Sequence, residues 1–376
     1  LDYATLESDG PQQWPYPAGA KAGRARLYEN AIFPTPSGRA RFVDTRHKPS
    51  AEKTDARHPL HLSTGRLRDQ WHGMSRTGRV ARLFNHVEEP LLSMSTRDMD
   101  RRQLRDGDLV KLRSRRGSIV IRVAASADLR PGQAFMPMHW GRRFLNSGGA
   151  NVLTLPTFDP VSRQPELKHA AVQVEKVSLP WQLVAMRVTP PGEEQELLAR
   201  LQPLLARFDH ASLGLFGRER PAVLLRAASA APVEEALLND IDAMLALDPG
   251  KCLSYADARR GISKRVMIEA GQVAGVRLTG ETAARDWLKE AITDGLPADA
   301  VRRWVLAPVA SLPQTGTARG RIVCACENVG EREIEALVSQ GAGLEALKDE
   351  LRCGTGCGSC VPELKAILRN RSKAAA

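Results

Sequence analysis

The sequence has 376 residues and contains no apolar run as long as a membrane-spanning helix, which needs about 20 residues. Aromatic residues make up only 5% of the chain, and no recognition-helix or RNA-binding signature is present. A G-x-G-x-x-G fingerprint is also missing, so we assign no flavin. We therefore expect a soluble protein that binds neither membranes nor nucleic acid. With a hydrophobic content of 43%, this length predicts two to three domains.

The sequence also has no initiator methionine and no signal peptide. Residues 1–57 are rich in proline and glycine, with short strands predicted at 26–28 and 38–42 around a turn. This beginning predicts a chain taken from the middle of a longer polypeptide. We expect a cytoplasmic location, where disulfides are disfavoured.

The net charge of +11 is concentrated in one region. Between Arg57 and Arg143 there are eighteen Lys and Arg residues against eight Asp and Glu, whereas residues 321–376 contain eight of each. Such a region favours an anionic ligand, and its scarcity of aromatic residues favours a compact phosphorylated ligand over nucleic acid. The alternative is a solvated basic face without a ligand.

Five of the six cysteines lie close together near the C-terminus, in Cys324-Ala-Cys326 and Cys353-Gly-Thr-Gly-Cys357-Gly-Ser-Cys360. Thiols gathered in this way usually bind a metal or form a redox dithiol. The glycines among them allow the backbone to wrap closely around a bound group and to direct N–H groups at sulfur. The interpretations are an iron-sulfur cluster, a zinc site, a thioredoxin-like dithiol and disulfides. A C-x-C spacing is poor for zinc.

Helical periodicity separates the two cysteine groups. Ile334, Leu337 and Val338 form one apolar stripe, a second stripe contains Leu344, Leu347 and Leu351, and glycines lie between them. Pro362 begins a third predicted helix directly after the last cysteine. The cysteines are thus expected in loops at helix ends.

This pattern of C-x-C, about thirty helical residues and C-x-x-C resembles the [2Fe-2S] domains of the bacterioferritin-associated ferredoxin type. The resemblance implies that Cys324, Cys326, Cys357 and Cys360 bind one [2Fe-2S] cluster. Cys353 is then the spare thiol.

Residues 58–181 show mostly β patterns. Leu60-His-Leu62 alternates, and residues 110–123 predict two strands around a turn at Gly117, which favours a closed or nearly closed barrel. Ser63 to Thr77 is the informative run, because its arginines can bind phosphate and its Trp, His, Ser and Thr side chains supply stacking and hydrogen bonds.

This run resembles the Thr-Gly-Arg...Trp-His segment of the molybdopterin-dinucleotide-binding domain in nitrate reductases and formate dehydrogenases. Residues 151–154 and 159–168 resemble two later motifs of that family, in the same order. The resemblance implies a double-psi β-barrel and a set of pterin-binding residues. These are Thr64, Gly65, Arg66, Trp71, His72, Gly73, Ser75, Thr77, Asn151 and Lys168. Taken singly, each residue also fits an ordinary core, surface or turn position.

After Pro180 the composition changes. Helices are predicted at 193–207, 233–247 and 281–292, with a hairpin at 265–278 that turns at Gly271. We therefore predict a multidomain protein with five regions. They are an irregular remnant of a preceding molybdopterin oxidoreductase domain (1–57), a pterin-binding barrel (58–181), an α+β domain (182–307), a linker (308–320) and a small all-α [2Fe-2S] domain (321–370).

The order of these regions resembles the assimilatory nitrate reductases of the molybdopterin oxidoreductase family. The resemblance implies molybdenum bis(molybdopterin guanine dinucleotide), nitrate as substrate, and an NADH-dependent flavoprotein or a ferredoxin as electron donor. The family's [4Fe-4S] motif and molybdenum-binding region have no counterpart in this sequence, so no catalytic residue is assigned. The alternative is a redox-sensing or electron-carrier protein whose barrel binds another anionic nucleotide.

Overall fold

The computed structural model describes residues 1–44, 46–312 and 319–374, and it divides the chain into two compact units, Leu1–Pro49 and Ser50–Ala376. In the first unit, helix α1 (Tyr3–Asp9) begins where the Asp2 carboxylate accepts a hydrogen bond from Thr5 N–H at 2.9 Å. The strands predicted at 26–28 and 38–42 do not form. This prediction was wrong because the two segments do not pair: the backbone bonds there close local turns.

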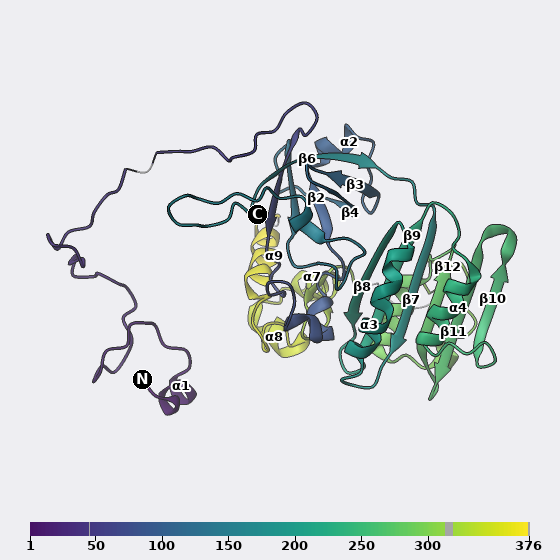
Figure 1. Cartoon of the computed structure of the whole chain (residues 1–376). Helices are drawn as coiled ribbons and strands as arrows, with labels where there is room; N and C mark the ends of the chain where they lie inside the picture. Colours follow the sequence, from purple (N-terminus) through teal and green to yellow (C-terminus); the bar gives the residue numbers. More distant parts are fainter. Residues whose placement is uncertain (45, 313–318, 375–376) are drawn as a thin grey trace. The chain divides into compact units, whose positions relative to one another are not determined.

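The second unit begins with a closed barrel, in which the strand order is β1-β5-β2-β4-β3-β6 (Figure 1). Alternate side chains of the strands point inward and form one apolar core, as the period of two in the sequence predicted. The β3–β4 hairpin forms as predicted, with Ser114 N–H bonded to Gly117 C=O at 2.9 Å. The strands are β1 (Leu60–Gly65), β2 (Leu91–Met94), β3 (Leu109–Arg113), β4 (Ser118–Ala125), β5 (Gln133–Pro137) and β6 (Ala170–Lys176).

Short helices fill the connections between barrel strands. Ser95 caps α2 (Thr96–Asp100) through a hydrogen bond from Asp98 N–H to its hydroxyl. The helices are η1 (Thr77–Arg79), η2 (Ala81–Phe84), α2 (Thr96–Asp100) and η3 (Gly149–Val152).

A six-stranded antiparallel sheet follows, in the order β10-β11-β12-β7-β9-β8. One face packs against α3 and α4 together with apolar residues of the barrel's connections, and the other packs against α5 and α6. The predicted hairpin at Gly271 is confirmed as β11–β12. The strands are β7 (Trp181–Val188), β8 (His210–Phe216), β9 (Ala222–Ser229), β10 (Cys252–Asp257), β11 (Ile262–Glu269) and β12 (Gln272–Thr279). The helices are α3 (Glu194–Leu201), η4 (Gln202–Arg207), α4 (Glu235–Met244), η5 (Ala258–Arg260), α5 (Arg285–Asp294) and α6 (Ala298–Val301).

The C-terminal region contains the three predicted helices, α7 (Glu331–Ser339), α8 (Leu344–Leu351) and α9 (Val361–Ala374), which lie beside the barrel (Figure 1). The expected all-helical domain also contains a two-stranded ribbon, β13 (Ile322–Cys324) and β14 (Val329–Gly330). This ribbon is too short to produce a visible alternation in sequence.

The predicted linker at 308–320 lies partly outside the described residues, because 313–318 are not among them. The boundaries predicted for the five regions stay predictions. None of the described helices has the length and apolar character to cross a membrane.

Candidate functional site

The connection from β1 to η1, residues 66–76, carries most of the predicted pterin-binding side chains and is here called the β1–η1 loop. His139, which follows β5, contacts this loop at two points. Its Nε2 accepts a hydrogen bond from Leu67 N–H at 2.8 Å, and its Nδ1 lies 2.6 Å from His72 C=O. This pair of contacts requires a neutral imidazole that carries its proton on Nδ1. Burial lowers the pKa of His139, which favours that neutral form.

Five of the residues expected to bind a ligand lie exposed in this loop. Arg66, Trp71, His72, Gly73 and Ser75 are exposed, and the Arg66 guanidinium lies 4.5 Å from the centre of the Trp71 ring. Among the described residues Arg66 has no carboxylate partner, so its donors are available to an anion. A planar guanidinium beside an exposed indole suits a ligand with both phosphate and aromatic parts.

Two of the predicted residues have a structural role as well. Thr64 is buried, and its hydroxyl donates to Leu167 C=O at 2.7 Å, which holds the segment carrying Lys168 against the end of β1. The Thr77 hydroxyl accepts a hydrogen bond from Trp71 N–H at 3.3 Å. Lys168 itself is exposed and has no ion pair within the described ranges.

Asn151 lies in η3, in the segment that follows β5. Gly149 has φ +67°, and a Cβ there would lie 1.9 Å from Trp140 C=O, so only glycine permits this contact. Trp140 directly follows His139, which contacts the β1–η1 loop. No hydrogen bond links Asn151 to Lys168 or to that loop in the part of the chain that the structure describes.

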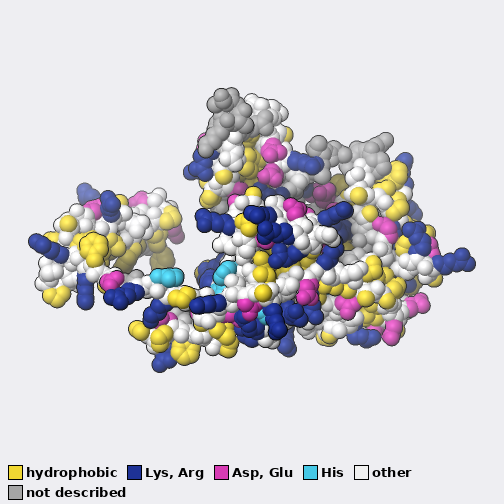
Figure 2. Space-filling model, turned by 90° about the horizontal axis from the view of Figure 1, so that it is seen from above, with side chains coloured by type: hydrophobic (Ala, Val, Ile, Leu, Met, Phe, Trp, Pro, Cys, Tyr) yellow, Lys and Arg dark blue, Asp and Glu magenta, His cyan; other side chains and the backbone are white. Residues whose placement is uncertain are grey.

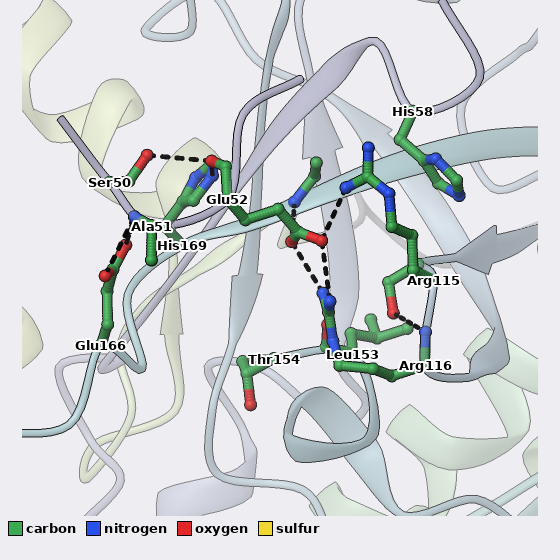
Figure 3. A network of polar contacts seen from close by, with 12 residues as sticks. Ser50, Ala51, Glu52, His58, Arg115, Arg116, Leu153, Thr154, Glu166 and His169 are labelled. Carbon is green, nitrogen blue, oxygen red and sulfur yellow. Dashed lines mark hydrogen bonds and ion pairs between the residues drawn. The ribbon is translucent and has the colours of Figure 1, made fainter. Parts of the chain in front are cut away.

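Glu52, which the sequence did not single out, connects the β3–β4 turn to β6 (Figure 3). Its carboxylate accepts hydrogen bonds from Arg115 and Arg116, both at 2.7 Å, and from Ala171 N–H at 2.9 Å. Arg116 also donates to Leu153 C=O, beside Asn151. Burial alone would raise the pKa of Glu52, but the bonds from Arg116, Ala171 and Arg115 lower it to about 2.

The basic region is therefore only partly available to a ligand. Lys and Arg side chains form several groups on the face of the molecule seen in Figure 2. Ion pairs already use several of the arginines that the charge count included, namely Arg68, Arg82, Arg102, Arg115, Arg116 and Arg122. A count of charged residues within one region therefore overstates the positive charge available to a ligand, because some of the carboxylate partners lie elsewhere in the chain.

Arg68 is a correction to the sequence interpretation, which placed it among the phosphate-binding residues of the loop. Its guanidinium contacts Glu363 Oε2 at 2.7 Å and Val323 C=O at 2.8 Å, in the C-terminal region. Asp69, the next residue, accepts a hydrogen bond from the Ser359 hydroxyl at 3.1 Å. The sequence alone could not predict these contacts because the partners are 255 to 295 residues apart.

The five C-terminal cysteines gather in one small core with the apolar side chains of α7, α8 and α9. Cys324, Cys353 and Cys360 are buried, Cys357 is exposed, and the sulfurs of Cys326 and Cys357 lie 3.3 Å apart. The thiols make pairwise contacts, and no three Cys, His, Asp or Glu side chains in the described ranges already surround one ion position. Their chemistry fits a cluster, which is bound by four thiolates.

Backbone N–H groups point at these sulfurs as the glycine content predicted. Hydrogen bonds from the Cys353 thiol and from the Gly354 and Glu327 N–H groups outweigh burial and lower the pKa of Cys324 to about 5. The contact with Cys324 and burial instead raise the pKa of Cys353. Burial likewise raises the pKa of Cys326 to about 11 and that of Cys360 to about 12, so the pKa values of the thiols do not separate the predicted ligands from Cys353.

A cavity of about 900 Å³ lies away from both groups, between α4 and β11. Its lining includes Asp242, Lys251 and Arg265 but none of the predicted pterin or cluster residues. Asp242 is buried in ion pairs with Arg265 and Arg277. This arrangement stabilises the sheet and indicates no chemistry of its own.

Comparison with known protein families identifies two of the regions. Residues 60–171 match the molybdopterin dinucleotide binding domain, and residues 322–370 match the BFD-like [2Fe-2S] binding domain. The chain therefore joins a domain for the pterin dinucleotide of a molybdenum cofactor to a domain for a [2Fe-2S] cluster, as predicted.

Individual relatives extend this result. The chain is 33% identical over 354 residues to a nitrate reductase of Klebsiella oxytoca, covering 88% of this chain and 36% of the relative. It is 36% identical over 181 residues to a nitrate reductase of Synechocystis, covering 47% and 25%. A third relative, the F420-dependent formate dehydrogenase subunit alpha of Methanocaldococcus jannaschii, is 31% identical over 177 residues, covering 47% and 25%.

The chain thus spans about a third of the length of the Klebsiella relative and a quarter of the other two. The predicted resemblance to nitrate reductases of the molybdopterin oxidoreductase family is confirmed. The individual pterin and cluster residues stay predictions.

Proposed function

We propose that this chain is part of a molybdenum-dependent nitrate reductase, in which it binds the pterin dinucleotide and relays electrons through a [2Fe-2S] cluster while nitrate is reduced to nitrite. One observation carries the proposal: the alignment with the Klebsiella nitrate reductase covers 88% of the chain, beyond the two domain matches. The formate dehydrogenase relative aligns with only 47%. Nitrate is therefore favoured over formate as the substrate.

The pterin dinucleotide would be held on the exposed side of the β1–η1 loop. Arg66 supplies charge-assisted donors for its phosphates, Trp71 an aromatic face, and His72, Ser75, Asn151 and Lys168 further polar groups. Thr64, Gly65, Gly73 and Thr77 shape the backbone around this side. When bound, the cofactor would supply the molybdenum that takes an oxygen atom from nitrate and leaves nitrite, at the expense of two electrons from the relay.

The cluster would be held by Cys324, Cys326, Cys357 and Cys360. Bound there, the cluster accepts and donates single electrons, while Gly354 N–H and Glu327 N–H donate hydrogen bonds to the Cys324 sulfur. An NADH-dependent flavoprotein or a ferredoxin would reduce it, and a [4Fe-4S] centre in another part of the enzyme would receive its electrons. We place this relay in cytoplasmic nitrate assimilation.

We also infer that the barrel is of the double-psi type. The parallel pairs β1–β5 and β2–β4 within a closed six-stranded barrel support this inference. The β1–η1 loop would then leave the barrel at the end where β5 also ends.

The test is to express the complete reading frame that contains this chain and to measure nitrite formation with a reduced viologen dye. We expect nitrate reduction in the wild type. Arg66→Ala and Lys168→Ala should lower the pterin and molybdenum content, because an anionic pyrophosphate loses a charged partner worth about 2 to 5 kcal/mol where it is buried. Unchanged molybdenum in both variants would contradict the assigned pterin site, and wild-type protein inactive with nitrate would contradict the function.

A further inference from the structure

The β1–η1 loop has a second side, which faces the cysteine-bearing region rather than solvent. Arg68 and Asp69 lie on it, and 19% and 4% of their side-chain surfaces are exposed. Leu67, between Arg66 and Arg68, donates its N–H to His139. Arg68 contacts Glu363, whereas Arg66 is exposed to solvent. Neither Arg68 nor Asp69 is thus available to a pterin on the exposed side.

Arg68 contacts both ends of the cluster-binding sequence. Its guanidinium donates to Val323 C=O, one residue before Cys324, and to Glu363, in the first turn of α9 after Cys360. It also contacts the Asp69 carboxylate at 3.2 Å. A guanidinium can serve three acceptors at once because its five N–H donors are arranged in a plane, which an ammonium group cannot imitate.

Asp69 contacts the loop between the last two predicted ligands. It accepts a hydrogen bond from Ser359, whose hydroxyl oxygen also lies 3.2 Å from the Cys357 sulfur. His86 Nδ1 lies 3.0 Å from the other carboxylate oxygen. Since a hydroxyl has one proton, Ser359 cannot donate to Asp69 and to a Cys357 thiolate at the same time.

Two neighbouring contacts extend the same surface. Arg218, in the turn between β8 and β9, forms an ion pair at 2.7 Å with Glu327, one residue after Cys326. Asn85 Nδ2 lies 3.5 Å from Ala325 C=O, between the first two predicted ligands. Segments beside all four predicted ligands therefore contact the rest of the unit.

We propose that Arg68 and Asp69 are positioning residues that dock the [2Fe-2S]-binding domain onto the β1–η1 loop, so that one loop serves both cofactor sites. The inference rests on the proposed function for the roles of the two cofactors. Arg68 supplies two of the contacts, and Asp69 adds a negative charge and competes with Cys357 for the Ser359 proton. The cluster is thereby held at a fixed place relative to the pterin-binding side of the loop.

Docking can be measured by cutting the folded chain between its domains. A protease site is placed at residues 313–318, the cluster is reconstituted with iron and sulfide, and the protein is cleaved and passed over a gel-filtration column. We expect the C-terminal fragment to stay with the barrel fragment in the wild type and to dissociate at least ten times more readily in Arg68→Ala. Separation of the wild-type fragments, or equal retention in Arg68→Ala, would overturn the proposal.

Matched variants test the two sides of the loop. Arg66→Ala removes the exposed arginine of the same loop and Arg130→Ala removes an exposed arginine elsewhere on the barrel, so both should retain the fragment. Glu363→Gln changes the partner on α9 and should weaken retention without adding to the effect of Arg68→Ala. Equal loss in Arg66→Ala and Arg68→Ala would contradict a two-sided loop. The visible absorption of the cluster and far-ultraviolet circular dichroism verify that each variant is folded.

The midpoint potential gives a readout that a purely structural role would not produce. Reduction adds negative charge to the cluster, so Asp69→Asn should raise the potential, and it also frees the Ser359 proton for the Cys357 sulfur. Arg68→Ala removes a positive charge and should lower the potential. Shifts of the same sign, or none, would contradict docking at these residues. Neither readout involves nitrate, so failure of the proposed function and failure of the docking are distinguishable.

Discussion

At the scale of single residues, Glu52 shows how one buried carboxylate connects separate parts of the barrel. It contacts the turn between β3 and β4 through Arg115 and Arg116, and β6 through Ala171 N–H. Its own backbone carbonyl lies 2.8 Å from His169 Nε2. Removal of the charge would leave Arg116 without a carboxylate partner and Arg115 with Asp55 only, which is more costly than loss of a surface pair.

We expect Glu52→Gln to lower the free energy of unfolding by about 3 kcal/mol at pH 7. The pKa of Glu52 is lowered from 4.5 to about 2 on folding, so its contribution is complete above pH 4.5 and is lost as pH falls toward 2. Urea unfolding of wild type and variant from pH 7 to pH 3 should therefore show a shrinking difference. Glu175→Gln, at the half-exposed pair with Arg113, is the control and should cost less than about 1 kcal/mol.

The five C-terminal cysteines differ in their expected effect on the cluster. Serine at Cys324, Cys326, Cys357 or Cys360 should bleach the visible absorption, because each removes a thiolate ligand. Cys353→Ser should leave it, since the other four cysteines complete the predicted ligand set and Cys353 is the spare thiol. Absorption spectra and iron analysis after reconstitution measure the difference. Bleaching by Cys353→Ser with retention in Cys357→Ser would show that the ligand set is wrong.

At the scale of secondary-structure elements, the sequence predicted the parts whose signals are local. The alternation in β1, the β3–β4 and β11–β12 hairpins and the helices α7 to α9 all follow from periodicity and turn residues. The ribbon β13–β14 and the failure of strands at 26–28 and 38–42 to form were not predicted. In both cases the outcome depends on whether a partner strand is near, which a short segment does not encode.

In the candidate site, too, some residues could be predicted from the sequence and others could not. Family motifs indicated the exposed residues of the β1–η1 loop, whereas Glu52 and His139 lie outside the motifs and act through contacts distant in sequence. Asp69 lies within the motif, but its contact with Ser359 could not be predicted from the sequence. Arg68 was assigned to phosphate for the same reason, since its partner Glu363 lies almost 300 residues away. Sequence patterns therefore indicated exposed residues of the β1–η1 loop, but not the residues that hold the loop in place.

The element η3 offers a test of how backbone geometry positions Asn151. Gly149→Ala would place a methyl group against Trp140 C=O at a positive φ, so we expect a loss of about 2 kcal/mol in stability. In the complete enzyme, pterin content should fall as Asn151 is displaced. Gly141→Ala is the control, because a Cβ there meets no atom within 4 Å. Normal stability and pterin content in Gly149→Ala would contradict this role.

At the scale of the whole molecule, the described part of the second unit contains two cofactor-binding domains and an antiparallel sheet that packs against the barrel's connections. Outside residues 324–360 the chain has a single cysteine, Cys252, half-buried at the start of β10. One cysteine is too few for a second thiolate-bound cluster. The chain therefore has ligands for one iron-sulfur centre only.

Purified and reconstituted under reducing conditions, the chain should bind two irons and two sulfides and, after reduction with dithionite, show the electron paramagnetic resonance signal of one [2Fe-2S] cluster. It should form no nitrite from nitrate, because it spans only 36% of the Klebsiella nitrate reductase and contains one barrel to cover part of a molybdenum cofactor. Iron analysis, resonance spectra integrated against a spin standard, and a nitrite assay with reduced viologen are the measurements. The Cys324→Ser variant controls for adventitious iron. Four irons per chain would show that the chain contains a second iron-sulfur centre. Nitrite formed by the metal-analysed chain would show that it contains the site of nitrate reduction.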